Sequence, residues 1–154
     1  MRKKDLYKLS RVNITRLLLK AITIFVVAFF MFIQARAAEP PNNLWQGLIG
    51  EAASEGYEGM YAVACVYRNR LKNNMPLGCV ALKRRDLDAF VRREGRKVEY
   101  IAKDIIRKVF EENGIDITKG ATHYENIETF GLPKWAYSMV RTVKIGNHTF
   151  YKRR

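Results

Sequence analysis

Apolar residues recur every three or four positions along much of the chain after residue 43. Between residues 59 and 71 they fall at i, i+3, i+4, i+7 and i+11, which is one face of a helix: Met60, Val63, Ala64, Tyr67 and Leu71. The same spacing predicts helices over 44–52 and 97–112, and a shorter helix over 85–93. The region from 44 to 112 is therefore expected to be largely helical.

Polar residues and glycines indicate where these helices begin and end. Asn43 stands at the expected cap of the first helix, because a side-chain oxygen there can accept a free backbone N–H. Gly56 and Gly59 predict a break before the second helix, and residues 73–78 are predicted to form a loop. Asn113 and the glycine after it end the last long helix.

The pattern changes toward the C-terminus. Residues 139–145 and 148–151 flank Gly146-Asn147 and predict a β-hairpin, since glycine supplies the positive φ that two-residue turns need. A further strand is expected within 121–125, after a turn-rich connection. Helices followed by a small antiparallel sheet make an α+β fold.

The first 37 residues have the pattern of an export leader. Seven basic residues and one acid lie within 1–20, thirteen uncharged residues follow at 21–33, and Ala35-Arg36-Ala37 is an A-x-A site. Thirteen helical residues reach about 20 Å, short of a roughly 30 Å bilayer core, so a cleaved signal peptide is favoured over a signal anchor extended by 17–19. Basic residues ahead of the apolar run keep that end cytoplasmic. Residues 38–154 are thus expected to be one exported domain, periplasmic, extracellular or in the cell wall.

The net charge of this domain indicates which classes of binding partner are favoured. The whole chain has a net charge of +13, and residues 38–154 keep 20 Lys plus Arg against 14 Asp plus Glu, a net +6. A basic exported domain suits an anionic polymer or a membrane surface. No nucleic-acid-binding motif is present, and export argues against nucleic acid. Membrane contact is expected only through the leader, and the oligomeric state is not indicated.

Few residues offer chemistry through a metal or a nucleophile. Zinc hydrolysis needs about three protein ligands, whereas the chain has only His123 and His148 and no H-E-x-x-H or C-x-x-C spacing. Cys65 lies on or beside an apolar helix face and is expected in the core. It could pair with Cys79 in an oxidising compartment, but two cysteines leave that open. No metal and no cofactor are expected.

Carboxylates are the remaining candidates. Glu51, Glu55 and Glu58 cluster in a Gly- and Ala-rich segment, and Glu51 and Glu55 are four residues apart, on one side of a helix. They are either solvated surface acids, as most helical glutamates are, or part of a catalytic site.

Residues 50–71, GEAASEGYEGMYAVACVYRNRL, resemble the opening motif of the SleB-like cell-wall hydrolases, which include spore cortex-lytic enzymes. In that family a GEA-x-x-E-x-x-x-G segment leads into an A-V-x-x-V-x-x-N-R helix, and Met75-Pro76 with Cys79-Val80 is similar to the loop that follows. Residues 116–121, DITKGA, are similar to a D-x-T-x-G-A element with Tyr124 at its aromatic position. Trp135 and residues 146–151, GNHTFY, fit the W and G-x-H-x-F-Y pattern. These blocks follow one another in the family's order from Leu44 to Tyr151.

The resemblance implies a lysozyme-like fold and cleavage of the glycan strand of peptidoglycan. Glu51 matches the catalytic acid, which must be protonated near neutral pH; partial burial beside apolar walls such as Leu48, Ile49 and Ala52 would favour that state. One such carboxyl suffices for a lytic transglycosylase, because the sugar's own 6-hydroxyl can close onto the anomeric carbon, and this reaction is favoured. A two-carboxylate hydrolase needs a partner, for which the sequence suggests only Glu55, with an orienting role as its alternative.

The remaining site residues follow from the same match. Tyr124, Trp135 and His148 are predicted to bind substrate, together with Glu55, since aromatic faces and hydrogen-bonding tips suit sugar rings; core packing is the alternative for the aromatic residues. Phe150 is expected in the core, and Asn69 and Arg70 are expected to brace the end of their helix.

Two features depart from the family's pattern. Residues 80–91, VALKRRDLDAFV, are basic and predicted helical where the family has an aromatic-Ser element, and no separate wall-binding module is present in the sequence. A short exported lysin (an endolysin) or a remodelling enzyme, from a bacterium or a phage, fits this plan. The competing class is a non-catalytic exported wall-binding protein of the same fold.

Overall fold

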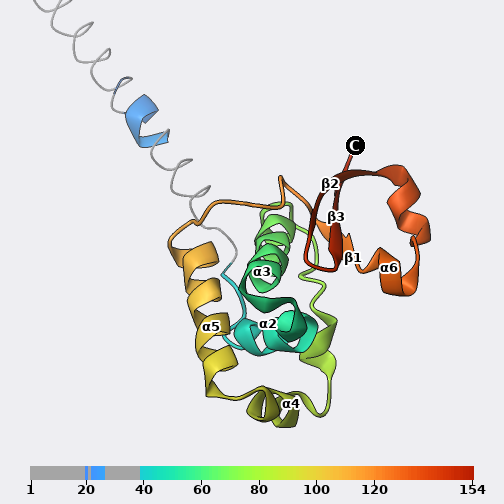
Figure 1. The fold of residues 1–154 in the computed structure, drawn as a ribbon. Helices are drawn as coiled ribbons and strands as arrows, with labels where there is room; N and C mark the ends of the chain where they lie inside the picture. The colour runs from blue at the N-terminus through green and yellow to red at the C-terminus, as the bar shows by residue number, and fades with distance from the viewer. Residues whose placement is uncertain (1–19, 21, 27–38) are drawn as a thin grey trace, which may run out of the picture. The chain divides into compact units, whose positions relative to one another are not determined.

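The computed structural model describes residue 20, residues 22–26 and residues 39–154. Residues 39–154 lie in one compact unit (Figure 1). Residues 22–26 are helical, and most of the predicted leader lies outside the described residues. Within the described part of the chain, no helix has the length and apolar character needed to cross a bilayer. The leader and its cleavage site stay predictions.

The helical part is built around two central helices. Helix α2 (Leu44–Ala52) packs against α3 (Gly56–Lys72), α4 (Leu87–Glu94) and α5 (Arg96–Ile106), which surround it in Figure 1. The predicted face of α3 is buried in this core through Met60, Val63, Ala64 and Tyr67. The periodic pattern therefore predicted both helices correctly, within a few residues of their ends.

Helix α3 is buried on a second face as well. Ala62 and Val66 are fully buried and pack with Ala121 and Phe150 of the sheet region. Figure 1 shows the sheet on the side of α3 away from α5. A helix that is apolar on more than one face belongs in the interior, between two layers. Helix α3 is thus the element that joins the helical part to the sheet.

One predicted helix boundary was wrong in detail, and one predicted capping contact is absent. The break before α3 is a 3₁₀ turn at Ala53–Glu55, and α3 already begins at Gly56, so Gly59 lies inside its first turn. Asn43 occupies the N-cap position of α2, but its side chain makes no capping hydrogen bond. The 3₁₀ turn matters for the site, because it carries Glu55 to the hairpin described below.

Helix α5 continues into a π-helical turn, Arg107–Glu111, and the chain then turns at Asn113. A π turn leaves carbonyl groups without their usual partners, and the buried Arg68 donates Nη1 to the carbonyl oxygens of Val109 (2.9 Å) and Gly114 (2.7 Å). Asn69, the next residue, donates to Asp116 Oδ2 (2.9 Å) and the carbonyl of Ala121 (3.0 Å). The predicted bracing role of Asn69 is confirmed, and its target is the loop that leads to the sheet.

The sheet has three antiparallel strands in the order β1-β3-β2. They are β1 (His123–Glu125), β2 (Met139–Ile145) and β3 (His148–Arg153), with a register irregularity between Arg141 and Val143. Tyr124 pairs with Phe150 across β1 and β3, and Phe150 is fully buried as predicted. The hairpin and the α+β, lysozyme-like class, with helices before a small antiparallel sheet, are confirmed.

Both cysteines are free and buried. Burial raises the pKa of the Cys65 thiol to about 11, and it also raises the pKa of Cys79. The pairing that the sequence left open is therefore absent from this structure, and both thiols are protonated near neutral pH.

Candidate active site

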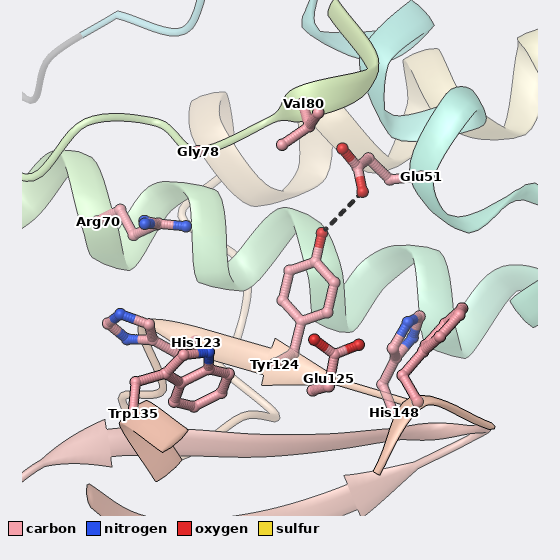
Figure 2. Close-up of a pocket in the computed structure, with 10 residues that line it drawn as sticks. Glu51, Arg70, Gly78, Val80, His123, Tyr124, Glu125, Trp135 and His148 are labelled. Carbon is pink, nitrogen blue, oxygen red and sulfur yellow. Dashed lines mark hydrogen bonds between the residues drawn. The ribbon is translucent and has the colours of Figure 1, made fainter. Parts of the chain in front are cut away.

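A cavity of about 390 Å³ opens between the helical part and the sheet, within the size range of small-ligand sites. Figure 2 shows the side chains that line it. Four of the five residues predicted for the site contribute: Glu51 from α2, Tyr124 from β1, Trp135 from the 3₁₀ helix η4 (Lys134–Ser138), and His148 from β3. The other lining residues are Arg70, Gly78, Val80, His123, Glu125 and Phe130.

The Glu51 carboxyl is held by two donors. The backbone N–H of Ala81 donates to Oε1 at 2.8 Å, and the Tyr124 hydroxyl donates to Oε2 at 3.4 Å, the contact dashed in Figure 2. The apolar walls expected from Leu48, Ile49 and Ala52 are not there, because α2 buries these side chains in the core. The residues that line the cavity with Glu51 instead include Val80 and Tyr124.

Two glycines of α2 bring Ala81 to Glu51. A Cβ on Gly50 would lie 2.6 Å from the Cβ of Ala81, and a Cβ on Gly47 would lie 2.5 Å from Cys79 Sγ. Glycines three residues apart on a helix leave one strip without side chains, and here the 3₁₀ helix η2 (Val80–Lys83) packs against that strip. The sequence GLIGE therefore sets the backbone N–H of Ala81 against the glutamate that follows.

Tyr124 stands beneath Glu51 as a partly buried donor. Burial is the main cause that raises the pKa of Tyr124 above its ordinary value, and the nearby Glu51 carboxylate raises it further. The phenol is therefore protonated near neutral pH and can donate to Oε2. Its ring makes edge contact with His148, with centroids 4.9 Å apart, and lies 5.8 Å from the ring of Phe150.

His148 and Trp135 complete the aromatic wall. His148 is 9% exposed, and its Nδ1 has no hydrogen-bond partner among the described residues. The nearest carboxylate oxygen, Glu55 Oε2, is 3.8 Å from this Nδ1, beyond hydrogen-bond distance. Trp135 packs against His123 (5.1 Å between centroids) and Tyr151 (5.4 Å).

Glu55 does not line the cavity. Its side chain is 6% exposed, Oε2 accepts the backbone N–H of Asn147 at 2.8 Å, and Oε1 accepts the side-chain amide of Asn147 at 3.1 Å. Both oxygens thus tie the turn before α3 to the tip of the β2–β3 hairpin. This placement supports the orienting role that the sequence also allowed, and direct substrate binding by Glu55 stays a prediction.

Sequence reasoning missed three polar residues of the cavity: Arg70, His123 and Glu125. The sequence suggests His123 only as a zinc ligand and Arg70 only as a helix brace, although Arg70 stands in the N-R motif and His123 lies next to the matched Tyr124. Burial lowers the pKa of His123, and the charges of Arg70 and Arg153 lower it further, so its ring is neutral near pH 7. Glu125 is a second carboxylate at the cavity, where the sequence had suggested Glu55. The sequence signal that could have found His123 and Glu125 is that both flank Tyr124, the residue at the family's aromatic position.

Comparison with known proteins identifies a family. The profile of the family described as Cell Wall Hydrolase matches residues 54–151, well over half of the chain. The match includes Tyr124, Trp135 and His148, and it begins three residues after Glu51. Searches of curated proteins and of solved structures gave no match.

Proposed function

Because this chain belongs to the cell wall hydrolase family, we propose that it cleaves the glycan strand of peptidoglycan with Glu51 as the general acid. Family membership supports peptidoglycan as the polymer that is degraded. The observation that carries the role of Glu51 is its carboxyl at the wall of a 390 Å³ cavity, oriented by the Ala81 N–H at 2.8 Å. A carboxylic acid in such a position can protonate the oxygen of a glycosidic bond.

The hydrogen bonds of Glu51 indicate which oxygen carries the proton. A protonated carboxyl has one donor oxygen, and Oε1 is already an acceptor from Ala81. We therefore place the proton on Oε2, which accepts only the longer contact from Tyr124. The Tyr124 hydroxyl lies 3.4 Å from Oε2, longer than the usual 2.5–3.0 Å of an O–H···O bond, so Oε2 is loosely held and open to a substrate oxygen.

The favoured reaction is lytic transglycosylation. Glu51 gives its proton to the glycosidic oxygen as the bond from that oxygen to the anomeric carbon breaks, which leaves positive charge on the sugar ring. The Glu51 carboxylate then takes the proton of the 6-hydroxyl of the same sugar, and that oxygen bonds to the anomeric carbon. The products are a 1,6-anhydro end and a new free hydroxyl, and Glu51 is protonated again.

Hydrolysis is the second candidate, and Glu125 is the observation that favours it. This carboxylate lines the same cavity as Glu51, and only its Oε1 has a hydrogen-bond partner among the described residues, the backbone N–H of Asn126 at 3.0 Å. Its Oε2 could position a water for attack on the anomeric carbon, as the second carboxylate of an inverting glycosidase does. That reaction ends in reducing sugars.

Digestion of purified peptidoglycan with mass spectrometry of the products tests both candidates. We expect wild-type protein to release 1,6-anhydro muropeptides, and Glu51→Gln to release none at an unchanged melting temperature, because glutamine can still accept from Ala81. Glu125→Gln should keep the anhydro products if transglycosylation is correct, and should abolish reducing ends if hydrolysis is. Clearing of peptidoglycan by Glu51→Gln would remove the acid-catalysis proposal. An inactive wild type that still binds the wall would favour a non-catalytic binding protein.

The proposed reaction takes place outside the cytoplasm, where peptidoglycan lies. Delivery there rests on the leader predicted at 1–37, as a cleaved signal peptide or a signal anchor. An exported lysin and a remodelling enzyme would use the same site, and both are consistent with this proposal.

A further inference from the structure

Arg70 brings a positive charge to the cavity that nothing in the described chain neutralises. Its side chain takes part in no ion pair and no hydrogen bond with any described residue. Its Nε atom is buried without a partner. Arg70 as a whole is partly buried, and a polar atom that is removed from water normally has a hydrogen-bond partner, because leaving it unmet is costly. An unpaired guanidinium at a cavity wall is therefore suited to an anionic group of a ligand.

In the loop before η2, the backbone at Gly78 passes close to this guanidinium. Gly78 has a left-handed φ of +75°, and a Cβ there would lie 2.0 Å from Arg70 Nη1 and 2.4 Å from Cζ. The left-handed φ favours glycine, and a larger residue at position 78 would force the Arg70 side chain to move. The Arg70 guanidinium therefore lies close against the Gly78 backbone at the cavity wall.

His123 adds a neutral hydrogen-bonding group near this cation. Both residues line the same cavity, and Figure 2 shows the His123 ring on the side of the cavity where Arg70 lies. The His123 Nδ1 is 3.0 Å from the Thr122 hydroxyl, which leaves Nε2 available to a ligand. Figure 2 shows Arg70, His123 and Trp135 toward one end of the cavity and Glu51 and His148 toward the other.

We propose that Arg70 and His123 form a carboxylate-binding subsite for the anionic substituent of the muramoyl sugar. The inference rests on the proposed function and names the part of the substrate that this end of the cavity recognises. A guanidinium fork binds a carboxylate through two parallel hydrogen bonds. The carboxylate has two sources, the peptide stem or the lactyl group of a strand without peptides. In both cases a glycan without carboxylates is a poor ligand.

Calorimetry in the Glu51→Gln background measures this recognition without cleavage. The ligands are a disaccharide-peptide oligomer, the same oligomer with its carboxyl groups methyl-esterified, a peptide-free glycan with free lactyl carboxyls, and a chitin oligosaccharide. We expect esterification to weaken binding by about ten- to hundred-fold, the effect of losing a charge-assisted contact. Tighter binding of the peptide oligomer than of the peptide-free glycan assigns the stem as the source, and the reverse assigns the lactyl group.

Variants separate the subsite from general charge effects. Arg70→Gln should lower the affinity for the carboxylate ligands to the level measured for the esters. Arg70→Lys keeps the charge but loses the two-pronged guanidinium, so its affinity should lie between those of the wild type and Arg70→Gln. Arg85→Gln is the matched control, because this exposed arginine does not line the cavity and its loss should change nothing. If Arg70→Gln lowers the melting temperature, His123→Ala serves as the second variant, with the same selective loss expected.

The failure of this inference differs from a failure of the proposed function. Equal affinity for the free and esterified oligomers, in a protein whose wild-type form digests peptidoglycan, overturns the subsite and leaves glycan cleavage intact. If the wild-type protein binds carboxylate ligands selectively but releases no products, the subsite proposal stands and the proposal of glycan cleavage is overturned. A chitin oligosaccharide that binds as tightly as the muramoyl ligands also overturns the subsite.

Discussion

At the scale of single residues, one phenol and one backbone N–H position the Glu51 carboxyl. We expect Tyr124→Phe to lower kcat about three- to ten-fold with little change in KM, because it removes one hydrogen bond of about 0.5–1.5 kcal/mol and keeps the ring contacts with His148 and Phe150. Steady-state kinetics on soluble glycan strands measure this. Tyr100→Phe, on an exposed tyrosine of α5, should leave both constants unchanged. A wild-type kcat in Tyr124→Phe would show that the hydroxyl does not position Glu51.

The neutral state of His123 gives a second prediction at this scale. Burial, and then Arg70 and Arg153, lower its pKa from the ordinary 6.5, so the fold favours the neutral ring. Protonation therefore costs stability, which should decline as the pH falls below about 6.5 toward the lowered value. We expect NMR titration to give a His123 midpoint below 6.5, and Arg70→Gln to raise it only in part, since burial remains. A midpoint at or above 6.5 in the wild type would contradict this environment.

At the scale of elements, the close packing of η2 on α2 places the Ala81 N–H beside Glu51. Alanine normally favours a helix over glycine by about 1 kcal/mol, yet Gly50→Ala should destabilise the protein by about 1–3 kcal/mol, because its Cβ would overlap Ala81. It should also lower kcat, since η2 must move away from Glu51. The double variant Gly50→Ala with Ala81→Gly removes the clash and should recover stability beyond the sum of the single effects, measured by denaturant unfolding. A stabilised Gly50→Ala protein would show that the two elements do not need this contact.

The contact of Glu55 with Asn147, which ties the helical part to the hairpin, is expected to affect stability more than activity. In Glu55→Gln an amide replaces one of the two oxygens that accept from Asn147, so we expect a loss of about 1–3 kcal/mol of unfolding free energy. Below its melting temperature this variant should keep most of its kcat. Glu51→Gln should show the reverse, full stability without activity. Thermal unfolding and kinetics on the same samples compare them, and a Glu55→Gln protein that is stable but inactive would assign a direct catalytic role instead.

The length of an element decided whether the sequence could predict it. Helices α2, α3 and α5 span several turns and show a clear 3.6-residue period, and the hairpin is marked by Gly146-Asn147. The helices α6 (Ile127–Phe130) and η4 contain four and five residues, too few for a period to appear, and they were missed, whereas η2 lies within the stretch 80–91 that was predicted to be helical.

The same limit applies to the candidate site. Glu51, Tyr124, Trp135 and His148 stand within motifs, so the resemblance of those motifs to a family was enough to group the four residues. Arg70 also stands in a matched motif, but its place at the cavity, like that of Glu125, follows only from the packing of α3, β1 and the loop at Gly78. Leu48 and Ile49 are close to Glu51 in sequence but do not line the cavity with it, because neighbouring residues on a helix point in different directions.

At the scale of the whole molecule, the basic surface and the cavity should respond differently to salt. Residues 38–154 have a net charge of +6, and exposed basic residues gather between 83 and 97, around α4. Attraction to an anionic wall is screened beyond about 10 Å at 0.1 M salt, whereas contacts inside the cavity are screened less. We expect KM on insoluble sacculi to rise from about 0.05 to about 0.5 M NaCl with kcat nearly constant.

The triple variant Lys83→Gln, Arg92→Gln and Lys97→Gln tests where this attraction originates. These side chains are exposed and take part in no ion pair within the described residues. Their loss should raise KM on sacculi at low salt and leave it unchanged at high salt, where screening has already removed the attraction. Short soluble strands are the control, because a small substrate has little contact with the surface around α4. Equal salt dependence on both substrates would place the charge effect in the cavity, at Arg70, and not on the surface.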